Sequence, residues 1–327
     1  TAIGDHATGT QLLSDWGKDL FIIINHVILS TGISLFGLCG NIINGTVFLK
    51  QGLRRSMNLS FFVLSLTDFC GLLTQVWHNF CLNPYIDRMG VPLDFMEIQF
   101  LTAGNPNACL VRVTCWITVY ITAERCLSIA IPLKIKQIVT FERTVLILVF
   151  VYLINVGALV PLYFSAYFSW KVYPGLNRTL LGVSYRSNKL IIQDLLYIFQ
   201  ATLGLVAFAA VIIFTTILIV NLRRKSEWRK KSTYDKDQST PMTSREKKTI
   251  RMVIVVACVL IVCYTPAATN SIVSSIVQDY TITGRQSNIF QAVWSFGFLF
   301  HSVNSSINIF LYYSMSSKYK ATFDEMF

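Results

Sequence analysis

The sequence predicts an all-α membrane protein, a bundle of seven transmembrane helices followed by a short amphipathic eighth helix. Three observations lead to this prediction. Of the 327 residues, 53% are hydrophobic and only 14% are charged, which is more apolar than one soluble core can hide. Seven apolar runs are each long enough to cross a bilayer, for which roughly 20 residues are needed. The basic residues gather between these runs.

The runs follow one another along a single domain, residues 1–327. In chain order they lie near residues 20–49, 58–82, 98–131, 144–168, 190–222, 250–277 and 288–313. Residues 316–327 are predicted to form a helix along the membrane surface, because Tyr319 and Phe323 lie four residues apart beside two lysines. The alternative is a frayed tail. Because the chain begins with Thr1 rather than Met, we expect it to be part of a longer protein.

The positions of Lys and Arg predict the orientation, because cytoplasmic loops of membrane proteins carry the excess of these residues. Of the 28, 19 lie in the segments after the first, third and fifth runs and in the tail, and seven lie on the opposite side. We therefore expect a multi-pass plasma-membrane protein with its N terminus outside and its C terminus in the cytoplasm. Asn177 starts an Asn-x-Thr triplet in an outer segment and is a candidate glycosylation site.

The net charge of +11 does not indicate a nucleic-acid partner, because the basic residues form no stripe interleaved with aromatic residues. The expected partners are instead the lipid bilayer and proteins or ligands on either side of it. The sequence also shows no nucleophile–base constellation, metal motif or phosphate-binding loop, so we do not expect an enzyme.

Asp68 lies in the middle of the second run, where an ionisable group is costly and usually functional. If neutral oxygens converge on its carboxylate, the group can bind a small cation. The candidate oxygen donors on the third and seventh runs are Thr114, Asn304 and Ser305. The alternative is a hydrogen-bonded acid that only holds helices together.

Glu124 and Arg125 end the third run on its cytoplasmic side. The arginine keeps its charge there, and the glutamate beside it can hold it in an ion pair. Glu246, at the start of the sixth run, is a second candidate partner, so movement of that helix would release Arg125. The alternative is that both charges only reach toward the interface. Pro266 kinks the sixth helix and lets a small outer displacement move its inner end, although proline also occurs in membrane helices for structural reasons.

A set of short motifs follows in one order along the chain: Asn41, Asp68, Glu124-Arg125-Cys126, Pro132-Leu133, Pro266 and Asn308-Ile309-Phe310-Leu311-Tyr312. In this order and spacing the whole chain resembles rhodopsin-like (class A) G-protein-coupled receptors. Within that class, residues 122–128 and 304–312 are similar to those of molluscan chemosensory and neuropeptide-like receptors.

The resemblance implies roles for residues that match the family's motifs. Arg125 would contact the G protein, with Glu246 as its inactive-state lock. The coupling and switch residues are then Glu124, Arg125, Glu246, Pro266, Asn308 and Tyr312. An allosteric sodium ion, the one candidate cofactor, would be held by Asp68, Thr114, Asn304, Ser305 and Asn308.

The departures from the family pattern concern its disulfide and its switch residues. Phe100 occupies the position of the cysteine that usually joins the third helix to the second outer loop, and residues 169–189 contain no Cys. We therefore expect no structural disulfide. Tyr264 replaces the usual tryptophan of the sixth helix, and Ile309 replaces the usual proline of the seventh.

The resemblance implies a ligand site in the outer half of the bundle. Asn107 stands where amine receptors carry an acid, and residues 287–313 contain no Lys for a retinal Schiff base, which excludes both ligand classes. Arg112 is a costly buried charge that an anionic ligand group would offset, the alternative being an internal hydrogen-bond network. The candidate pocket residues are Trp77, His78, Asn107, Val111, Arg112, Tyr264, Ser271, Gln278, Trp294, Phe298 and His301.

Together these observations predict a receptor that binds an extracellular small molecule or peptide and activates a heterotrimeric G protein. One alternative is a helical transporter or channel, which would show inverted repeats or charges along a continuous path. A decoy or constitutively active receptor is a second alternative, supported by the changes at Tyr264 and Ile309.

Overall fold

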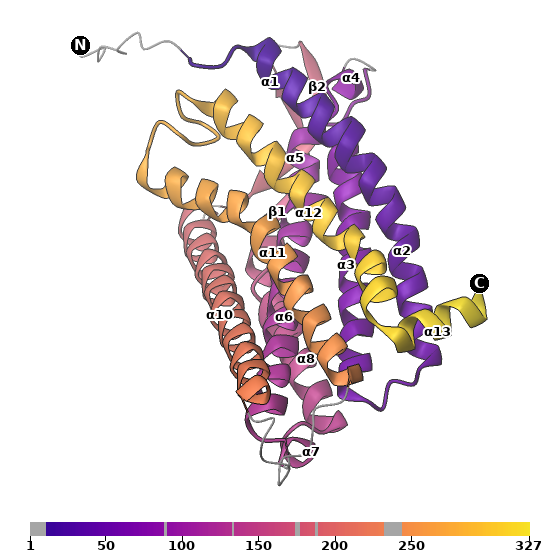
Figure 1. Cartoon of the computed structure of the whole chain (residues 1–327). Coiled ribbons are helices and arrows are strands. Elements are labelled where there is room, and N and C mark those ends of the chain that lie inside the picture. The colour runs from indigo at the N-terminus through magenta and orange to yellow at the C-terminus, as the bar shows by residue number, and fades with distance from the viewer. Residues whose placement is uncertain (1–10, 88–89, 133, 174–176, 187–188, 232–243) are drawn as a thin grey trace.

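The computed structural model describes residues 11–87, 90–132, 134–173, 177–186, 189–231 and 244–327. It is a bundle of long helices with a β-hairpin at one end (Figure 1). The hairpin lies at the same end as the start of the first helix, and the last helix lies at the opposite end. We call these two ends the hairpin end and the α13 end.

Seven long helical segments of the described chain build the bundle. In chain order they are α1 (Asp15–Ile22), η1 (Ile23–Ser30) and α2 (Thr31–Lys50) as one continuous segment; α3 (Ser56–Cys81); α6 (Asn105–Ala130); α8 (Phe141–Gly157) with α9 (Val160–Ser165); α10 (Lys189–Lys231); α11 (Ser244–Ile276); and α12 (Ser287–Met315). Five of these, within 15–50, 56–81, 141–165, 195–224 and 247–276, are long and apolar enough to cross a membrane by composition alone. The other two, α6 and α12, are rich in polar residues.

The shorter elements lie at the two ends of the bundle. They are α4 (Pro84–Asp87), α5 (Phe95–Gln99), the π-helical η2 (Phe100–Gly104), α7 (Ile135–Ile138) and α13 (Ser317–Met326), together with strands β1 (Ala166–Tyr173) and β2 (Arg178–Tyr185). The strands pair antiparallel, from Ala166 opposite Tyr185 to Tyr173 opposite Arg178.

Several helix ends differ from the ends of the predicted runs. The fourth helical segment ends at Ser165 rather than near residue 168, because Ala166 already begins β1. At the α13 end, α10 continues to Lys231 and α11 starts at Ser244, beyond the predicted limits of 222 and 250. Hydropathy marks only the apolar part of a helix, and Lys, Arg and Glu continue it readily into water.

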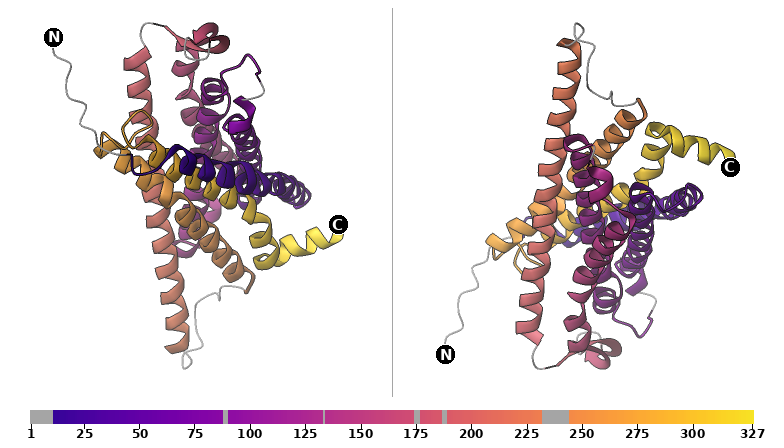
Figure 2. Two further views of the ribbon diagram at one scale, coloured as in Figure 1. Left: turned by 90° about the horizontal axis from the view of Figure 1, so that it is seen from above. Right: turned by 90° about the horizontal axis from the view of Figure 1, so that it is seen from below.

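The central helix of the bundle is α6, which packs against α3, α8, α10 and α11. Around it, α2 packs against α3 and α12, and α11 packs against both α10 and α12, so that the ring closes. Figure 2 shows this arrangement along the bundle axis. Because α6 is enclosed by protein, its Arg112, Thr118 and Glu124 are buried against other helices, as expected for polar groups at membrane depth.

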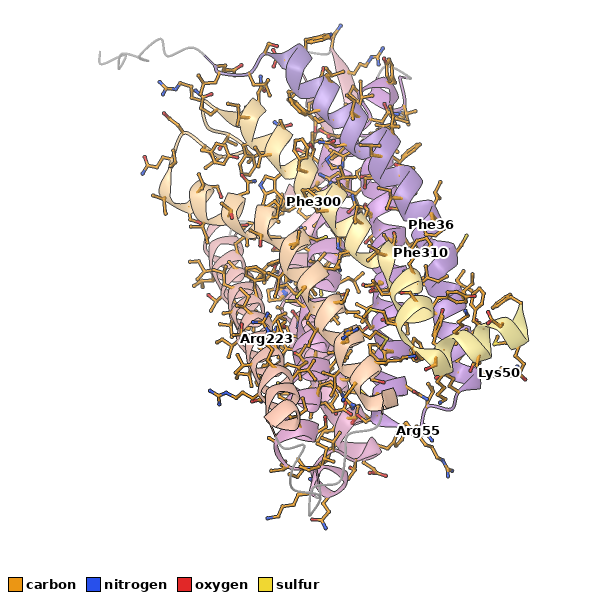
Figure 3. The ribbon with its side chains drawn as sticks, in the orientation of Figure 1. Phe36, Lys50, Arg55, Arg223, Phe300 and Phe310 are labelled. Carbon is orange, nitrogen blue, oxygen red and sulfur yellow. The ribbon has the colours of Figure 1, made fainter. Side chains whose placement is uncertain are left out.

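A close contact at Gly37 joins α2 to α12. A Cβ atom added to Gly37 would lie 2.0 Å from the Ser306 hydroxyl, so only glycine permits this approach. The Ser306 hydroxyl donates to the Ile33 carbonyl at 3.0 Å. At the edge of this α2–α12 seam the rings of Phe36 and Phe310 stack with centroids 5.5 Å apart (Figure 3).

The C-terminal helix α13 is docked onto the bundle, which contradicts the frayed-tail alternative. Tyr319 is 1% exposed, and its hydroxyl donates to the Asn44 Oδ1 atom at 2.6 Å. Lys50, which lies beside α13 (Figure 3), pairs with Glu325 at 3.1 Å. The buried hydrogen bond between Tyr319 and Asn44 holds α13 against the bundle more firmly than the packing of its apolar face alone.

Candidate functional site

The candidate pocket residues do not form one cluster in the hairpin half of the bundle. His78, Asn107 and Arg112 are buried. Val111, Tyr264, Ser271, Trp294, Phe298 and His301 are half-buried, whereas Trp77 and Gln278 are exposed. The set therefore falls into an aromatic and histidine group between η1, α3 and α12, and a second group around Arg112.

Asn107 lies in a contact between helices. Its amide nitrogen donates to the Gly71 carbonyl at 2.9 Å and to the Thr74 hydroxyl at 3.2 Å. The amide that the sequence analysis placed toward a ligand is thus engaged with α3. Ser271 is similarly occupied, because its hydroxyl donates to the Ala267 carbonyl within α11 at 2.9 Å.

The histidine group is built from aromatic contacts. His78 lies 4.3 Å from the Phe298 ring and 5.5 Å from the His26 ring, measured between centroids. One ring nitrogen of His78 is hydrogen-bonded to Gln99 at 2.8 Å, and the other has no partner among the described residues. Trp294 lies 6.1 Å from Phe298. The predicted pocket set did not include His26, an ionisable residue of the first apolar run, which joins the first helix to this group.

Arg112 forms the second group with residues of three other helices. Its Nε atom donates to the side-chain Oδ1 atom of Asn155 on α8 at 3.4 Å. A Cβ added to Gly204 of α10 would lie 3.1 Å from the Tyr264 hydroxyl and 3.6 Å from the Arg112 Cδ atom. The missing side chain of Gly204 thus lets Arg112 and Tyr264 come close to α10.

Asp68 is surrounded by the donors that its position predicted, except for one. It is 1% exposed. Thr114 and Ser305 donate hydroxyl protons to its Oδ1 atom at 3.0 and 3.1 Å, and Asn308 donates to Oδ2 at 2.9 Å. Among the described residues, Asn304 makes no hydrogen bond to Asp68. One carboxylate with two hydroxyl oxygens is an all-oxygen set that suits a hard cation.

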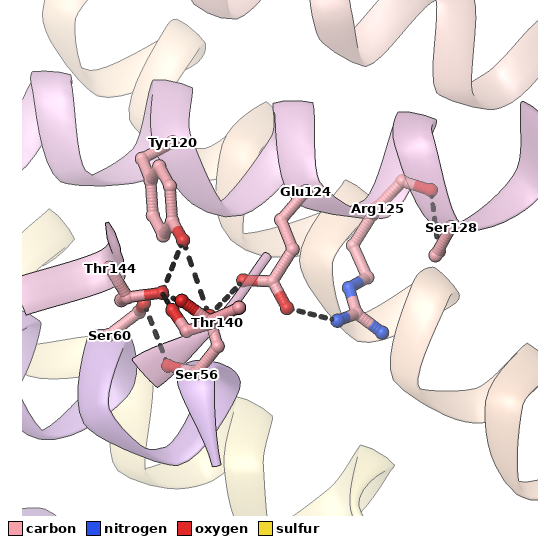
Figure 4. Close-up of polar contacts among 8 residues, drawn as sticks. All are labelled: Ser56, Ser60, Tyr120, Glu124, Arg125, Ser128, Thr140 and Thr144. Atoms are coloured by element: carbon pink, nitrogen blue, oxygen red, sulfur yellow. Dashed lines mark hydrogen bonds and ion pairs between the residues drawn. The ribbon is translucent and has the colours of Figure 1, made fainter. Parts of the chain in front are cut away.

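At the α13 end, a chain of hydrogen bonds holds Glu124 and Arg125 (Figure 4). The Arg125 guanidinium lies 2.7 Å from Glu124 Oε1, and the Ser56 hydroxyl donates to Oε2 at 2.9 Å. The Thr144 hydroxyl donates to Ser56 at 2.9 Å, and Tyr120 lies 2.6 Å from Thr144. Residues of α3, α6 and α8 therefore fix one carboxylate, which in turn holds Arg125.

The remaining switch residues have different settings. Pro266 lies inside α11. Tyr312 is fully buried, its ring centroid lies 5.1 Å from that of Phe61, and its hydroxyl has no partner in the described chain. Glu246 is the residue predicted to lock Arg125. Its side chain lies outside the described residues.

A cavity of about 470 Å³ opens beside Arg125. It lies between the α2–α3 loop and helices α3, α6, α11, α12 and α13. The basic residues among its described lining are Arg54, Arg55, Arg125, Lys248 and Lys318, and the acid among them is Glu124. Because Glu124 is already paired with Arg125, the cavity presents a surplus of positive charge.

At the hairpin end, polar contacts join β1 and β2 to α5. Lys171 lies 3.0 and 2.8 Å from the two carboxylate oxygens of Glu97, and the Val183 amide donates to the same carboxylate at 2.7 Å. Tyr173 donates to Asp94 at 2.7 Å; desolvation, and then this bond, raise the pKa of Tyr173. Sequence analysis missed these contacts, because the partners lie far apart along the chain.

These contacts join the hairpin to the bundle without a disulfide. All eight cysteines are free. Phe100 packs against a cluster that contains Val183 of β2 and Leu196 of α10. Asn177, in the turn between the strands, is exposed and has a φ of 46°, a conformation that asparagine tolerates.

The fold can now be compared with known families. Residues 28–327, from within η1 to the end of α13, match the family described as "Serpentine type 7TM GPCR chemoreceptor Srw". The chain belongs to this chemoreceptor family. The chemoreceptor is therefore a multi-pass membrane protein with a seven-helix bundle. A family of this kind has G proteins and ligands as its general partners, and its members are generally not enzymes.

The family match is coarser than the two resemblances predicted from the motifs. It does not address the placement among rhodopsin-like receptors or the similarity to molluscan receptors, and both stay predictions. The chemoreceptor matches no curated protein.

Proposed function

We propose that this chemoreceptor binds an extracellular small molecule or peptide in the hairpin half of its bundle and activates a heterotrimeric G protein at the α13 end. The single observation that carries the proposal is the basic cavity beside Arg125. Its volume of about 470 Å³ has room for side chains of a docked partner segment. Its positive charge favours an acidic partner surface and speeds the encounter with it.

The hydrogen bonds around Glu124 support a closed state of this site. Arg125 is held by one carboxylate at 2.7 Å, and its Nε atom has no partner in the described chain. An arginine with spare donors can bond to backbone carbonyls or carboxylates of a docked protein. Activation would then consist of loosening Glu124, with Pro266 as the bend that lets α11 move.

We propose that the receptor lies in the plasma membrane. In the proposed orientation its hairpin end faces the outside of the cell. Lys50, Arg55 and Arg223 lie toward the α13 end (Figure 3), which is the cytoplasmic end by the distribution of basic residues. Asn177 then lies on the extracellular hairpin, where its exposed side chain is open to glycosylation.

We also infer that sodium modulates the receptor at Asp68. The two hydroxyl oxygens that donate to this carboxylate keep lone pairs for a cation. The described residues contain no group of three His, Cys, Asp or Glu side chains that would suit a more demanding metal. A bound cation would join α3, α6 and α12 and so favour one arrangement of these helices.

Nucleotide exchange on purified G proteins tests the proposed function. The receptor is reconstituted in lipid nanodiscs and measured with and without pools of small molecules and peptides, beside Arg125→Ala. Lys50→Ala is the matched control, because Lys50 is a basic residue near the same end that does not line the cavity. We expect exchange with the wild type and the control but not with Arg125→Ala. Equal exchange by all three, or none by the folded wild type, contradicts the proposal.

A further inference from the structure

We propose that the ligand of the hairpin half is a small organic acid whose carboxylate binds Arg112. This inference rests on the proposed receptor function, because it names the ligand class of the same site. Its starting point is the poor pairing of a buried charge. Arg112 is 6% exposed, its bond to Asn155 is long at 3.4 Å, and its Nη2 atom has no partner in the described chain.

No acid of the described residues compensates this charge. Arg112 takes part in none of the ion pairs found there. A guanidinium stays protonated even when buried, and an unpaired buried charge is strongly unfavourable. A carboxylate fits it best, because two oxygens accept two parallel N–H bonds from the planar group.

A second unpartnered donor lies on α10, the helix that packs against α6 beside Arg112. Gln200 is 5% exposed, and its amide nitrogen has no partner among the described residues. It precedes Gly204 by four residues, so both lie on the same face of α10. Gly204 in turn adjoins Arg112, with 3.6 Å between the position of an added Cβ and the Arg112 Cδ atom. Two buried donors on facing helices indicate a ligand rich in acceptors.

The surroundings favour a compact acid over a peptide. Arg112 lies seven residues into α6, or about 10 Å below its first residue at 1.5 Å per residue. Toward the hairpin end, this side of the bundle is closed by the buried cluster of Leu101, Leu162, Val183 and Leu196. Leu196 lies one turn above Gln200 on α10, so a ligand at Arg112 sits beneath the hairpin rather than open to water.

Thermal unfolding of the receptor in nanodiscs tests the site without knowledge of the natural ligand. The probe is sodium formate, the smallest carboxylate, against sodium chloride at equal ionic strength, because chloride carries no carboxylate and the sodium concentration stays the same. We expect formate to raise the Tm of the wild type by about 2–4 °C and to leave Arg112→Met unchanged. In chloride, Arg112→Met should be at least as stable as the wild type, because it removes an unpaired buried charge.

Arg285→Gln is the control for the loss of an arginine, since Arg285 pairs with Asp279 at 2.8 Å at a half-exposed site. It should respond to formate as the wild type does. A lower Tm of Arg112→Met in chloride would show that Arg112 is a structural group and overturn the proposal. An equal formate response of wild type and Arg112→Met would also overturn it.

A second series separates small acids from peptides. Hexanoate and benzoate are compared with hexanamide and benzamide, and with an N-acetylated tripeptide that has a free C-terminal carboxylate. We expect the two acids to stabilise the wild type and the two amides to have no effect. Stronger stabilisation by the tripeptide would overturn the assignment to small acids. Because this readout needs no G protein, failure of the exchange assay and failure of the acid site are distinguished.

Discussion

The ammonium of Lys171 in β1 lies 2.8 Å from the Glu97 carboxylate of α5. This ion pair fastens the β-hairpin to the helix bundle in a chemoreceptor whose eight cysteines are all free. A covalent link would hold the hairpin at any ionic strength. An ion pair that is about one-third exposed on each side is instead weakened by salt.

We therefore predict a measurable but modest coupling between Lys171 and Glu97. In a double-mutant cycle of Lys171→Met and Glu97→Gln, the coupling free energy of unfolding should be roughly 1 kcal/mol at low salt and smaller in molar salt. The same cycle on the more exposed pair of Asp279 and Arg285 is the comparison and should give less. A Lys171–Glu97 coupling near zero at low salt would contradict this account of the hairpin.

Gly37→Ala should destabilise the receptor through the α2–α12 seam. The new Cβ would lie 2.0 Å from the Ser306 hydroxyl and 2.6 Å from a Leu72 methyl group, and overpacking of this kind costs about 1–3 kcal/mol. Gly32→Ala, in the same helix with nothing within 4 Å of its added Cβ, should be neutral or stabilise by up to about 1 kcal/mol. Thermal unfolding of both variants checks the pair, and equal effects would refute the seam as a tight contact.

Thr144→Val should raise basal nucleotide exchange. It removes the hydroxyl that donates to Ser56 at 2.9 Å and so loosens the support of Glu124. The loss of the hydrogen bond to Ser56, about 1 kcal/mol, should shift the closed-to-open ratio roughly fivefold.

Ser128→Ala is the matched control for this hydrogen-bond chain. Its hydroxyl donates to the backbone carbonyl of Arg125 at 2.7 Å and does not touch Glu124 (Figure 4). Its basal exchange should equal that of the wild type. If Thr144→Val behaves like this control, the hydrogen-bond chain has no part in holding Arg125.

Asp68→Asn should abolish the sodium dependence of the receptor. The measurement compares the Tm, and the affinity of any agonist found, in sodium chloride and in choline chloride. Without the carboxylate the site loses its negative charge, so both quantities should become equal in the two salts. An Asp68→Asn receptor that still responds to sodium would show that the ion binds elsewhere.

Asn304→Ala tests which side chains belong to the sodium site. The sequence analysis included Asn304, but of the described side chains those hydrogen-bonded to the Asp68 carboxylate are Thr114, Ser305 and Asn308. We expect Asn304→Ala to keep its sodium response and Ser305→Ala to weaken it. The opposite order, read from the same Tm comparison, would favour the sequence-based set.

The bundle itself and the grouping around Asp68 are predictable from local patterns. An apolar run of about 20 residues has few stable conformations in a bilayer other than a helix. A lone acid at mid-depth needs donors, and the nearest candidates lie on neighbouring helices. The eighth helix was predicted from the spacing of Tyr319 and Phe323, but its anchor on Asn44 was not.

The sequence by itself therefore determined the number of long helices and the presence of charged groups inside them, because hydropathy and charge are properties of a short window. The tertiary structure alone decided which groups meet. It turned the Asn107 amide toward Gly71, left the Arg112 Nη2 atom without a partner among the described residues, and brought Lys171 to Glu97. Such pairings depend on how helices cross and how a loop folds back, and these relations between distant residues have no signature in any single window of the chain.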